Sequence, residues 1–341
     1  MESPMISHPT RKQFQGCLVG QALGDALGFV VEGQPPTFCR RYVEERLGGE
    51  RVLGPGRRPF LLGQYSDDTQ LARELMQSYA ACGRFDPEDY ARRIAAIFSE
   101  GRIVGRGRAT EEAAERLARG VPWDEAGTPP PSASNGSAMR AAPIGLLFYD
   151  DLDSLAQAAR EQGFITHRDT RCSAGAVAVA GAVALTLREG PVEPLDFLGR
   201  LSELTVRVHA PFADALISLS GWVSLPLEQA VAHISRVGLE RELDKRWNEI
   251  TPFVMPSVLW SLYSFLRSPE DYWQTIRTAI AVGGDVDTTA AMAGAICGAH
   301  LGLAKIPRRL ARRITDQGSW GFPQLTDLAG KCYDIKHRQH A

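Results

Sequence analysis

Four glycines recur at intervals of four residues near the start of the chain: Gly16, Gly20, Gly24 and Gly28. Because residues i and i+4 of an α-helix share a face, these glycines would line one side of a helix over residues 14–30 without any side chains. Glycine costs about 1 kcal/mol relative to alanine inside a helix, so the stripe predicts that a neighbouring backbone approaches very closely. A membrane pairing motif does not fit, because the segment is short and contains Asp25.

Apolar residues recur at helical spacing through most of the 341 residues, for example over 68–82, 171–188 and 288–304. Two long Pro- and Gly-rich segments, 33–64 and 120–136, lack this spacing, and connections of such length are usually functional or disordered. No fixed repeat emerges, which argues against a solenoid. The sequence therefore predicts an all-α fold. Because similar helices flank both connections, we expect one compact domain over residues 1–341, with a core at about 14–330 and a flexible tail at 1–12.

Composition narrows the function classes. The 40 acidic and 38 basic residues nearly cancel, so no overall field favours general nucleic-acid or membrane-surface binding. The six cysteines form no CxxC pair, which is typical of buried free thiols in a cytoplasmic protein. The N-terminus has no apolar signal segment, and no apolar run reaches the roughly 18 residues of a membrane span. We expect a cytoplasmic protein with a small or neutral partner.

Two acidic clusters stand at the starts of predicted helices. The first is SDDT, with Ser66, Asp67 and Asp68, and the second is GGDVDTT, with Asp285, Asp287 and Thr288. Helix capping alone is one explanation, because Ser, Thr and Asp are preferred N-caps and acids complement the helix dipole. One aspartate suffices for a cap, however, and each cluster carries two together with hydroxyl groups.

The chemistry of the two clusters is the same. Both offer only carboxylate and hydroxyl oxygens, which are the ligands of a hard cation such as Mg²⁺, Mn²⁺ or Ca²⁺ rather than Zn²⁺. If the clusters met, their four carboxylates would repel one another until cations neutralised them, and a two-metal site would be the natural arrangement. Spacing alone does not show that they meet, because more than 200 residues separate them.

Five segments, in this order, carry a family resemblance: GDALG (24–28) followed by Glu32, SDDT (66–69), SNGSAMRAAPIG (134–145), THRD (166–169) and GGDVDTTAAMAGAICGA (283–299). Together they resemble the ADP-ribosylglycohydrolase family over about residues 14–305. The resemblance implies a compact domain of orthogonal helices and a binuclear magnesium or manganese centre.

The resemblance also implies roles for individual residues. It places two Mg²⁺ or Mn²⁺ ions on Ser66, Asp67, Asp68, Asp285, Asp287 and Thr288. Glu32 matches an acidic residue on a mobile loop of relatives, although by itself it could be an ordinary solvated glutamate after a helix. Among the candidate catalytic residues Glu32, Asp68 and Asp285, we expect Glu32 to transfer the proton, because a carboxylate bound to a metal is a poor base. We interpret Asp25 as structural, a cap or hydrogen-bond acceptor.

The substrate residues follow from the same resemblance. Gly136 and Ser137 match a segment that contacts the substrate phosphates, and Asn135 and Met139 lie beside it. A helix N-cap explains this segment equally well, and both can hold because helix N-termini bind phosphate. His167 matches a histidine near the substrate, although a lone histidine is more often structural. Gly105 and Gly107 resemble a loop that passes the ribose. Some arginine-directed relatives carry an aspartate near the position of Gly105, so its absence argues against an arginine-specific base there.

The sequence thus predicts a metal-dependent hydrolase that cleaves the glycosidic bond between the distal ribose of ADP-ribose and an acceptor, either a protein side chain or a small molecule. The transition state should resemble an oxocarbenium ion. Two alternatives stay open: a non-catalytic ADP-ribose-binding or structural relative, and a two-metal nucleotide phosphohydrolase. The oligomeric state is left open, and a monomer is favoured. The acceptor, the choice between Mg²⁺ and Mn²⁺ and the physiological partner are left open.

Overall fold

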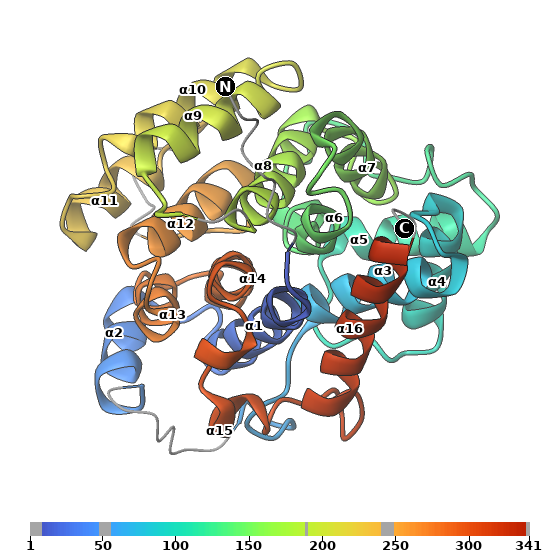
Figure 1. Ribbon diagram of the computed structural model, residues 1–341, viewed down its shortest axis with the longest axis horizontal. Coiled ribbons are helices and arrows are strands. Elements are labelled where there is room, and N and C mark those ends of the chain that lie inside the picture. Colours follow the sequence, from blue (N-terminus) through green and yellow to red (C-terminus); the bar gives the residue numbers. More distant parts are fainter. Residues whose placement is uncertain (1–8, 48–55, 188–189, 240–248, 339–341) are drawn as a thin grey trace.

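The structure is a computed structural model that describes residues 9–47, 56–187, 190–239 and 249–338. Within these ranges the chain forms sixteen α-helices and two short 3-10 turns, and its β-type pairings are isolated bridges (Figure 1). The all-α prediction is confirmed. The elements are α1 (Arg11–Phe29), α2 (Pro36–Glu45), α3 (Asp67–Cys82), α4 (Pro87–Ser99), α5 (Arg108–Ala118), η1 (Asn135–Ser137), α6 (Ala142–Leu147), α7 (Leu152–Phe164), α8 (Thr170–Thr186), α9 (Pro194–Thr205), α10 (Ala210–Ser220), α11 (Leu227–Ile234), α12 (Val254–Arg267), α13 (Tyr272–Ile280), α14 (Val286–Leu301), η2 (Leu303–Lys305), α15 (Arg308–Ala311) and α16 (Phe322–Arg338).

Helices α1 and α14 lie side by side near the middle of the molecule and share the most extensive contact of the described helices (Figure 1). A methyl group on Gly20 would overlap the backbone carbonyl of Gly294, and a methyl group on Gly294 would overlap the carbonyl of Gly20. The other glycines of the stripe face the backbone around α14 in the same way: Gly16, Gly24 and Gly28. The predicted close approach is confirmed.

The remaining helices surround this central pair. Helices α8, α12 and α13 pack against α14, whereas α3, α6 and α16 pack around α1. Helices α9, α10 and α11 form an outer layer on α8 and α12 (Figure 1). Because α1 and α14 are enclosed, nearly every side chain along them is buried, including the polar ones near the C-terminal end of α1 and the N-terminal end of α14.

A capping box fixes the start of α1. The backbone N–H of Gln13 donates to Thr10 Oγ1 at 3.3 Å, and the backbone N–H of Thr10 donates to Gln13 Oε1 at 2.8 Å. The helix therefore begins at Arg11, inside the segment 1–12 that the sequence assigned to a flexible tail. The rest of that prediction, over residues 1–8, lies outside the described residues.

Two helices were missed by the sequence interpretation. Helix α2 lies inside the segment 33–64, where Pro36 occupies the first helical position instead of breaking the chain. Helix α16 extends beyond the predicted core limit of residue 330. Its buried residues Leu325, Leu328, Ala329 and Cys332 follow the spacing of an amphipathic helix, so the signal for α16 was present in the sequence.

The cysteines are free, and five of the six are buried, whereas Cys82 at the end of α3 is exposed. The prediction of buried thiols is therefore wrong for Cys82. In the described part of the chain, no helix is both long enough and apolar enough to cross a membrane.

The contact between α1 and α14 predicts a large effect of a small substitution. We expect Gly20→Ala to lower the free energy of unfolding by about 2 kcal/mol, because the added methyl group forces two backbones apart and this cost exceeds the roughly 1 kcal/mol gained in helix propensity. Urea unfolding followed by circular dichroism measures the change.

Gly199 in α9 is a matched control, because a Cβ added there has no neighbouring atom within 4 Å. Gly199→Ala should raise the free energy of unfolding by up to about 1 kcal/mol. Equal effects of the two substitutions would contradict the close approach of α1 and α14.

Candidate functional site

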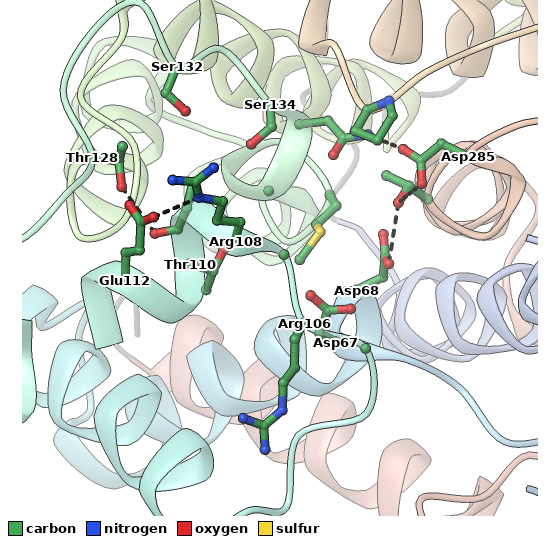
Figure 2. Close-up of a pocket in the computed structure, with 18 of the residues that line it drawn as sticks. Asp67, Asp68, Arg106, Arg108, Thr110, Glu112, Thr128, Ser132, Ser134 and Asp285 are labelled. Atoms are coloured by element: carbon green, nitrogen blue, oxygen red, sulfur yellow. Dashed lines mark hydrogen bonds and ion pairs between the residues drawn. The ribbon is translucent and has the colours of Figure 1, made fainter. Parts of the chain in front are cut away.

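The two acidic clusters lie together in the structure. Asp67 and Asp68 begin α3, Asp285 and Asp287 flank the first residue of α14, and all four line one cavity of about 930 Å³. Thr288 Oγ1 lies 3.4 Å from Asp68 Oδ2 and 3.1 Å from Asp285 Oδ1, so one hydroxyl group bridges the clusters. Figure 2 labels Asp68 and Asp285, the two acids that it joins. The structure thus brings together the acids that the sequence places 218 residues apart.

Asp25 on α1 sets the position of α3. Its carboxylate accepts hydrogen bonds from the backbone N–H of Ser66 at 2.8 Å, the backbone N–H of Thr69 at 3.0 Å and the Thr69 hydroxyl at 2.6 Å. The hydroxyl of Ser66, the N-cap residue itself, donates to Asp68 Oδ2 at 2.9 Å and accepts only a long bond of 3.4 Å from the backbone N–H of Asp68. A carboxylate from a neighbouring helix therefore caps α3, as the structural interpretation of Asp25 expected.

The start of α14 is held differently. Asp285 is its N-cap residue, but its carboxylate makes no capping hydrogen bond to the backbone. Instead, Asp285 Oδ2 accepts a 2.5 Å hydrogen bond from Asn135 Nδ2, and Oδ1 accepts the bond from Thr288. Capping alone therefore does not explain the acid at this position, and the carboxylate faces the cavity.

Gly283 and Gly284 make the turn into α14 possible. Both have positive φ angles, 78° and 82°, which side chains rarely tolerate. The carbonyl of Gly284 accepts a hydrogen bond from the N–H of Gly33 at 2.8 Å, and its N–H donates to the carbonyl of Gln34 at 3.0 Å. These two bonds attach the turn to the segment that carries Glu32.

Burial and crowding raise the pKa of each aspartate in this cluster. Loss of solvation is the largest cause, and it raises the pKa of Asp25 and Asp67 to about 7 and that of Asp285 to about 6. The pKa values of Asp68 and Asp287 lie well above the usual range, because neighbouring carboxylates add their repulsion to the loss of solvation. The ionised cluster therefore needs positive charge from elsewhere.

The oxygen atoms of this cluster fit a cation. One carboxylate oxygen each from Asp25, Asp68 and Asp287 lie within 4.8 Å of one another, and the same holds for Glu32, Asp285 and Asp287. Asp68 Oδ1 is buried and has no hydrogen-bond partner in the described structure. A buried, unpaired carboxylate oxygen is costly, and a hard divalent cation is the partner that such a set of oxygens suits.

Glu32 lies at the rim of the cavity, three residues after the end of α1. Its carboxylate forms an ion pair with Arg57, whose guanidinium stacks over the ring of Phe29 at 4.9 Å. The Glu32 side chain is about one-third exposed and Asp67 is partly buried, whereas the other aspartates of the cluster are buried. Glu32 is thus an acid of the cluster with access to solvent.

The cavity extends away from the acids between the loop before α5 and the segment around η1. Five predicted substrate residues line it: Gly105, Gly107, Asn135, Gly136 and Met139. The cavity wall also contains polar residues that the sequence interpretation did not single out: Thr110, Thr128, Ser132 and Ser134 (Figure 2). These four are ordinary surface residue types without a distinctive spacing, so the sequence held no signal for them.

Ser137 and His167 lie behind this wall. The Ser137 hydroxyl is buried and donates to the carbonyl of Cys172 at 3.0 Å. The His167 ring lies between the hydroxyls of Ser134 and Thr166, each at 2.8 Å. Burial lowers the pKa of His167 to about 3, so the ring is neutral and supports the wall without carrying charge.

Two amides link the cavity wall to the acids. Asn135, expected beside the substrate, donates its side-chain N–H groups to Asp285 and to the Ser257 hydroxyl. Gln21 on α1 donates to the backbone carbonyls of Asp68 at 3.0 Å and Met139 at 2.9 Å. The sequence interpretation missed Gln21. A polar residue within the apolar helix that carries the glycine stripe was a signal for such a role.

Comparisons with known proteins agree on one family. Residues 7–341 match the family described as ADP-ribosylglycohydrolase. The chain is 32% identical to ADP-ribosylhydrolase ARH3 of Gallus gallus, over 98% of this chain and 96% of the relative. It is 26% identical to ADP-ribosylarginine hydrolase Tri1 of Serratia proteamaculans, over 89% of this chain and 75% of the relative. A solved structure described as an ADP-ribosylglycohydrolase-related protein complex aligns with a TM-score of 0.72 and 26% identity, over 96% of this chain and 98% of that one.

The raised pKa values predict how pH affects the metal-free protein. An aspartate whose pKa is higher when folded holds its proton longer in the folded state, so stability falls as the pH rises through the folded pKa. In the presence of EDTA, we expect the free energy of unfolding in urea to fall between pH 7 and pH 8, above the ordinary histidine pKa of about 6.5, so that His167 is largely neutral in both states.

Asp287→Asn removes one of these titrating groups, so the fall should be smaller in this variant. A free energy of unfolding that stays constant or rises over this pH range would show that the acids do not share one buried pocket.

Proposed function

The chain belongs to the ADP-ribosylglycohydrolase family, and on this basis we propose that it hydrolyses the glycosidic bond between the distal ribose of ADP-ribose and an acceptor. The acceptor is a protein side chain or a small-molecule conjugate. The observation that carries the proposal is the meeting of two remote acidic pairs in one cavity, where a buried oxygen of Asp68 lacks a partner. A helix start with a purely structural role would not need this arrangement.

We propose that two Mg²⁺ or Mn²⁺ ions bind at this end of the cavity. Their ligands would be Ser66, Asp67, Asp68, Asp285, Asp287 and Thr288. When bound, the ions supply positive charge next to the reacting sugar. Carboxylate and hydroxyl oxygens suit these ions, and the raised pKa values show that the acids lack enough positive charge of their own.

The rest of the cavity suits a nucleotide diphosphate. Gly136 has no room for a side chain, because a Cβ there would lie 2.7 Å from His167 Cε1, so its backbone forms the cavity wall directly. The first N–H group of η1, that of Asn135, donates to the carbonyl of Pro252 at 2.9 Å, so the N–H group left for a ligand is the next one, that of Gly136. We propose that the turn η1 receives the diphosphate and that the acidic end receives the distal ribose.

We propose Glu32 for the proton transfer. The Glu32 side chain is about one-third exposed at the rim of the cavity, and its partner is Arg57. Asp68 and Asp285 would support the reaction mainly as ligands, because a carboxylate that holds a cation is a poor base. The developing positive charge of an oxocarbenium-like transition state is favourable beside these carboxylates.

The linkage that is cleaved distinguishes members of this family. The Serratia relative is described as an ADP-ribosylarginine hydrolase. In this chain Gly105 has a φ of 81°, and a Cβ there would lie 2.5 Å from Asp67 Oδ1. An aspartate on this loop would displace Asp67, which supports an acceptor other than arginine.

The direct test is a panel of proteins ADP-ribosylated on serine or on arginine, with release of ADP-ribose measured by chromatography. We expect release with Mg²⁺ or Mn²⁺, loss of release with EDTA, and loss with Asp287→Asn. Asp214→Asn is the matched control, because this aspartate is exposed on α10, outside the cavity.

Other products would favour the alternatives. AMP released from free ADP-ribose would identify a nucleotide phosphohydrolase instead. A thermal shift with ADP-ribose but no release from any substrate, small-molecule conjugates included, would identify a non-catalytic binding protein.

The role of Glu32 makes a separate prediction. Glu32→Gln should lower kcat by about 100-fold or more, because a positioned proton-transfer group contributes on this scale. The Kd for ADP-ribose should change little, since the substitution preserves shape. Glu44→Gln on the exposed face of α2 is the control. If Glu32→Gln keeps full turnover with metal present, a group other than Glu32 transfers the proton.

A further inference from the structure

The turn at residues 316–320 contains both non-glycine residues with positive φ in the described part of the chain. Gln317 has a φ of 51° and Trp320 a φ of 44°. Two backbone hydrogen bonds of 2.8 Å between Asp316 and Ser319 close the turn. Residues with side chains rarely adopt positive φ angles, and they do so where surrounding contacts impose this conformation. The contacts of this turn should therefore explain why its backbone adopts this conformation.

Those contacts reach the start of α3. Asp316 is buried, and its carboxylate accepts hydrogen bonds from Arg73 at 2.6 Å and from Gln70 Nε2 at 2.8 Å. The guanidinium of Arg73 also lies over the Trp320 ring at 5.0 Å. The turn is thus bound to the helix that carries Asp67, close to the residues that line the cavity.

Gln70 connects the turn to the cavity wall. Its side chain is fully buried, with Nε2 donating to the carbonyl of Arg102 at 3.0 Å and Oε1 accepting from the N–H of Val104 at 2.8 Å. A carboxylate only accepts hydrogen bonds, so Asp316 forces the NH₂ group of Gln70 toward itself. The amide oxygen must then face the N–H of Val104. Asp316 therefore fixes the orientation in which Gln70 holds the backbone of 102–104.

The segment that Gln70 holds leads directly into the cavity wall. Gly105 follows Val104 and lies against Asp67, with no room for a side chain between them. Gln317 also binds this segment, because its Nε2 donates to the carbonyl of Arg102 at 3.0 Å. Asp67 and Gln70 belong to the same first turn of α3, so the loop and the acid are tied to one rigid element.

We propose that Gln70 is a positioning residue, oriented by Asp316, that holds the loop 102–107 against Asp67 and so sets the width of the cavity at its acidic end. This inference deepens the proposed function and rests on it. A loop released from Gln70 would move away from Asp67, and misplacement of a cavity wall by about 1 Å can cost about 100-fold in rate.

The test compares Gln70→Met with Tyr90→Phe. Methionine keeps the size of the side chain but makes none of the three hydrogen bonds. Tyr90 on α4 is equally buried, and its hydroxyl donates to the carbonyl of Leu71 on α3 rather than to the loop, so Tyr90→Phe matches the loss of a buried bond. We expect faster hydrogen exchange at the Val104 amide in Gln70→Met alone, with Kd for ADP-ribose raised about tenfold or more.

A second variant separates positioning from stability. Gln317→Gly relieves the positive φ and also removes the bond to Arg102, so its Tm should be unchanged or higher while the affinity for ADP-ribose falls. This variant keeps the test decisive if Gln70→Met does not fold.

Three results decide the inference. Faster Val104 exchange together with weaker ADP-ribose binding supports it. Unchanged exchange in Gln70→Met, or faster exchange with Kd and kcat unchanged, overturns it. Failure of the wild-type protein to release ADP-ribose would overturn the proposed function, whereas the exchange rate of Val104 still reports whether Gln70 holds the loop, because that measurement needs no ligand.

Discussion

The contact between the backbones of α1 and α14 is the constraint on which the site depends. Because Gly20 and Gly294 leave no side chains between the two helices, the end of α1 reaches the start of α14. Asp25 on α1 then caps α3, and the first turn of α3 is brought beside Asp287. Wider separation of the two helices would carry the acids apart, so the glycine stripe and the acidic cluster are parts of one arrangement.

This arrangement brings several carboxylates that repel one another to the centre of the fold. The carboxylates that meet there are buried, and burial and mutual repulsion raise their pKa values. Protein groups relieve this repulsion only in part, through the bonds of Asn135 to Asp285 and of Ser66 to Asp68. Asp68 Oδ1 is left without a hydrogen-bond partner among the described residues. Bound cations would relieve the remaining repulsion, which is why the folded chain without metal is expected to lose stability as its acids ionise.

Local signals in the sequence predicted most of the helices, although not α2 and α16, the close approach of α1 and the chemistry of the two acidic clusters. They could not show that Asp68 and Thr288 meet, because periodicity within a helix carries no information on contacts 220 residues apart; the family resemblance supplied that link. The bond between Gln70 and Asp316 was unpredictable for the same reason, with 246 residues between its partners. Asn135, expected beside the substrate, lines the cavity, but its bond to Asp285 depends on how η1 packs against the start of α14.

The central claim is that acids from α3 and α14 jointly hold divalent cations. Crystals grown with Mn²⁺ and measured at the manganese absorption edge test this claim most directly, since anomalous scattering locates the metal without assumptions about activity. We expect two strong peaks within ligand distance of Asp67 and Asp68 on one side and of Asp285 and Asp287 on the other. A difference map without a peak between the two pairs, at saturating Mn²⁺, would contradict it.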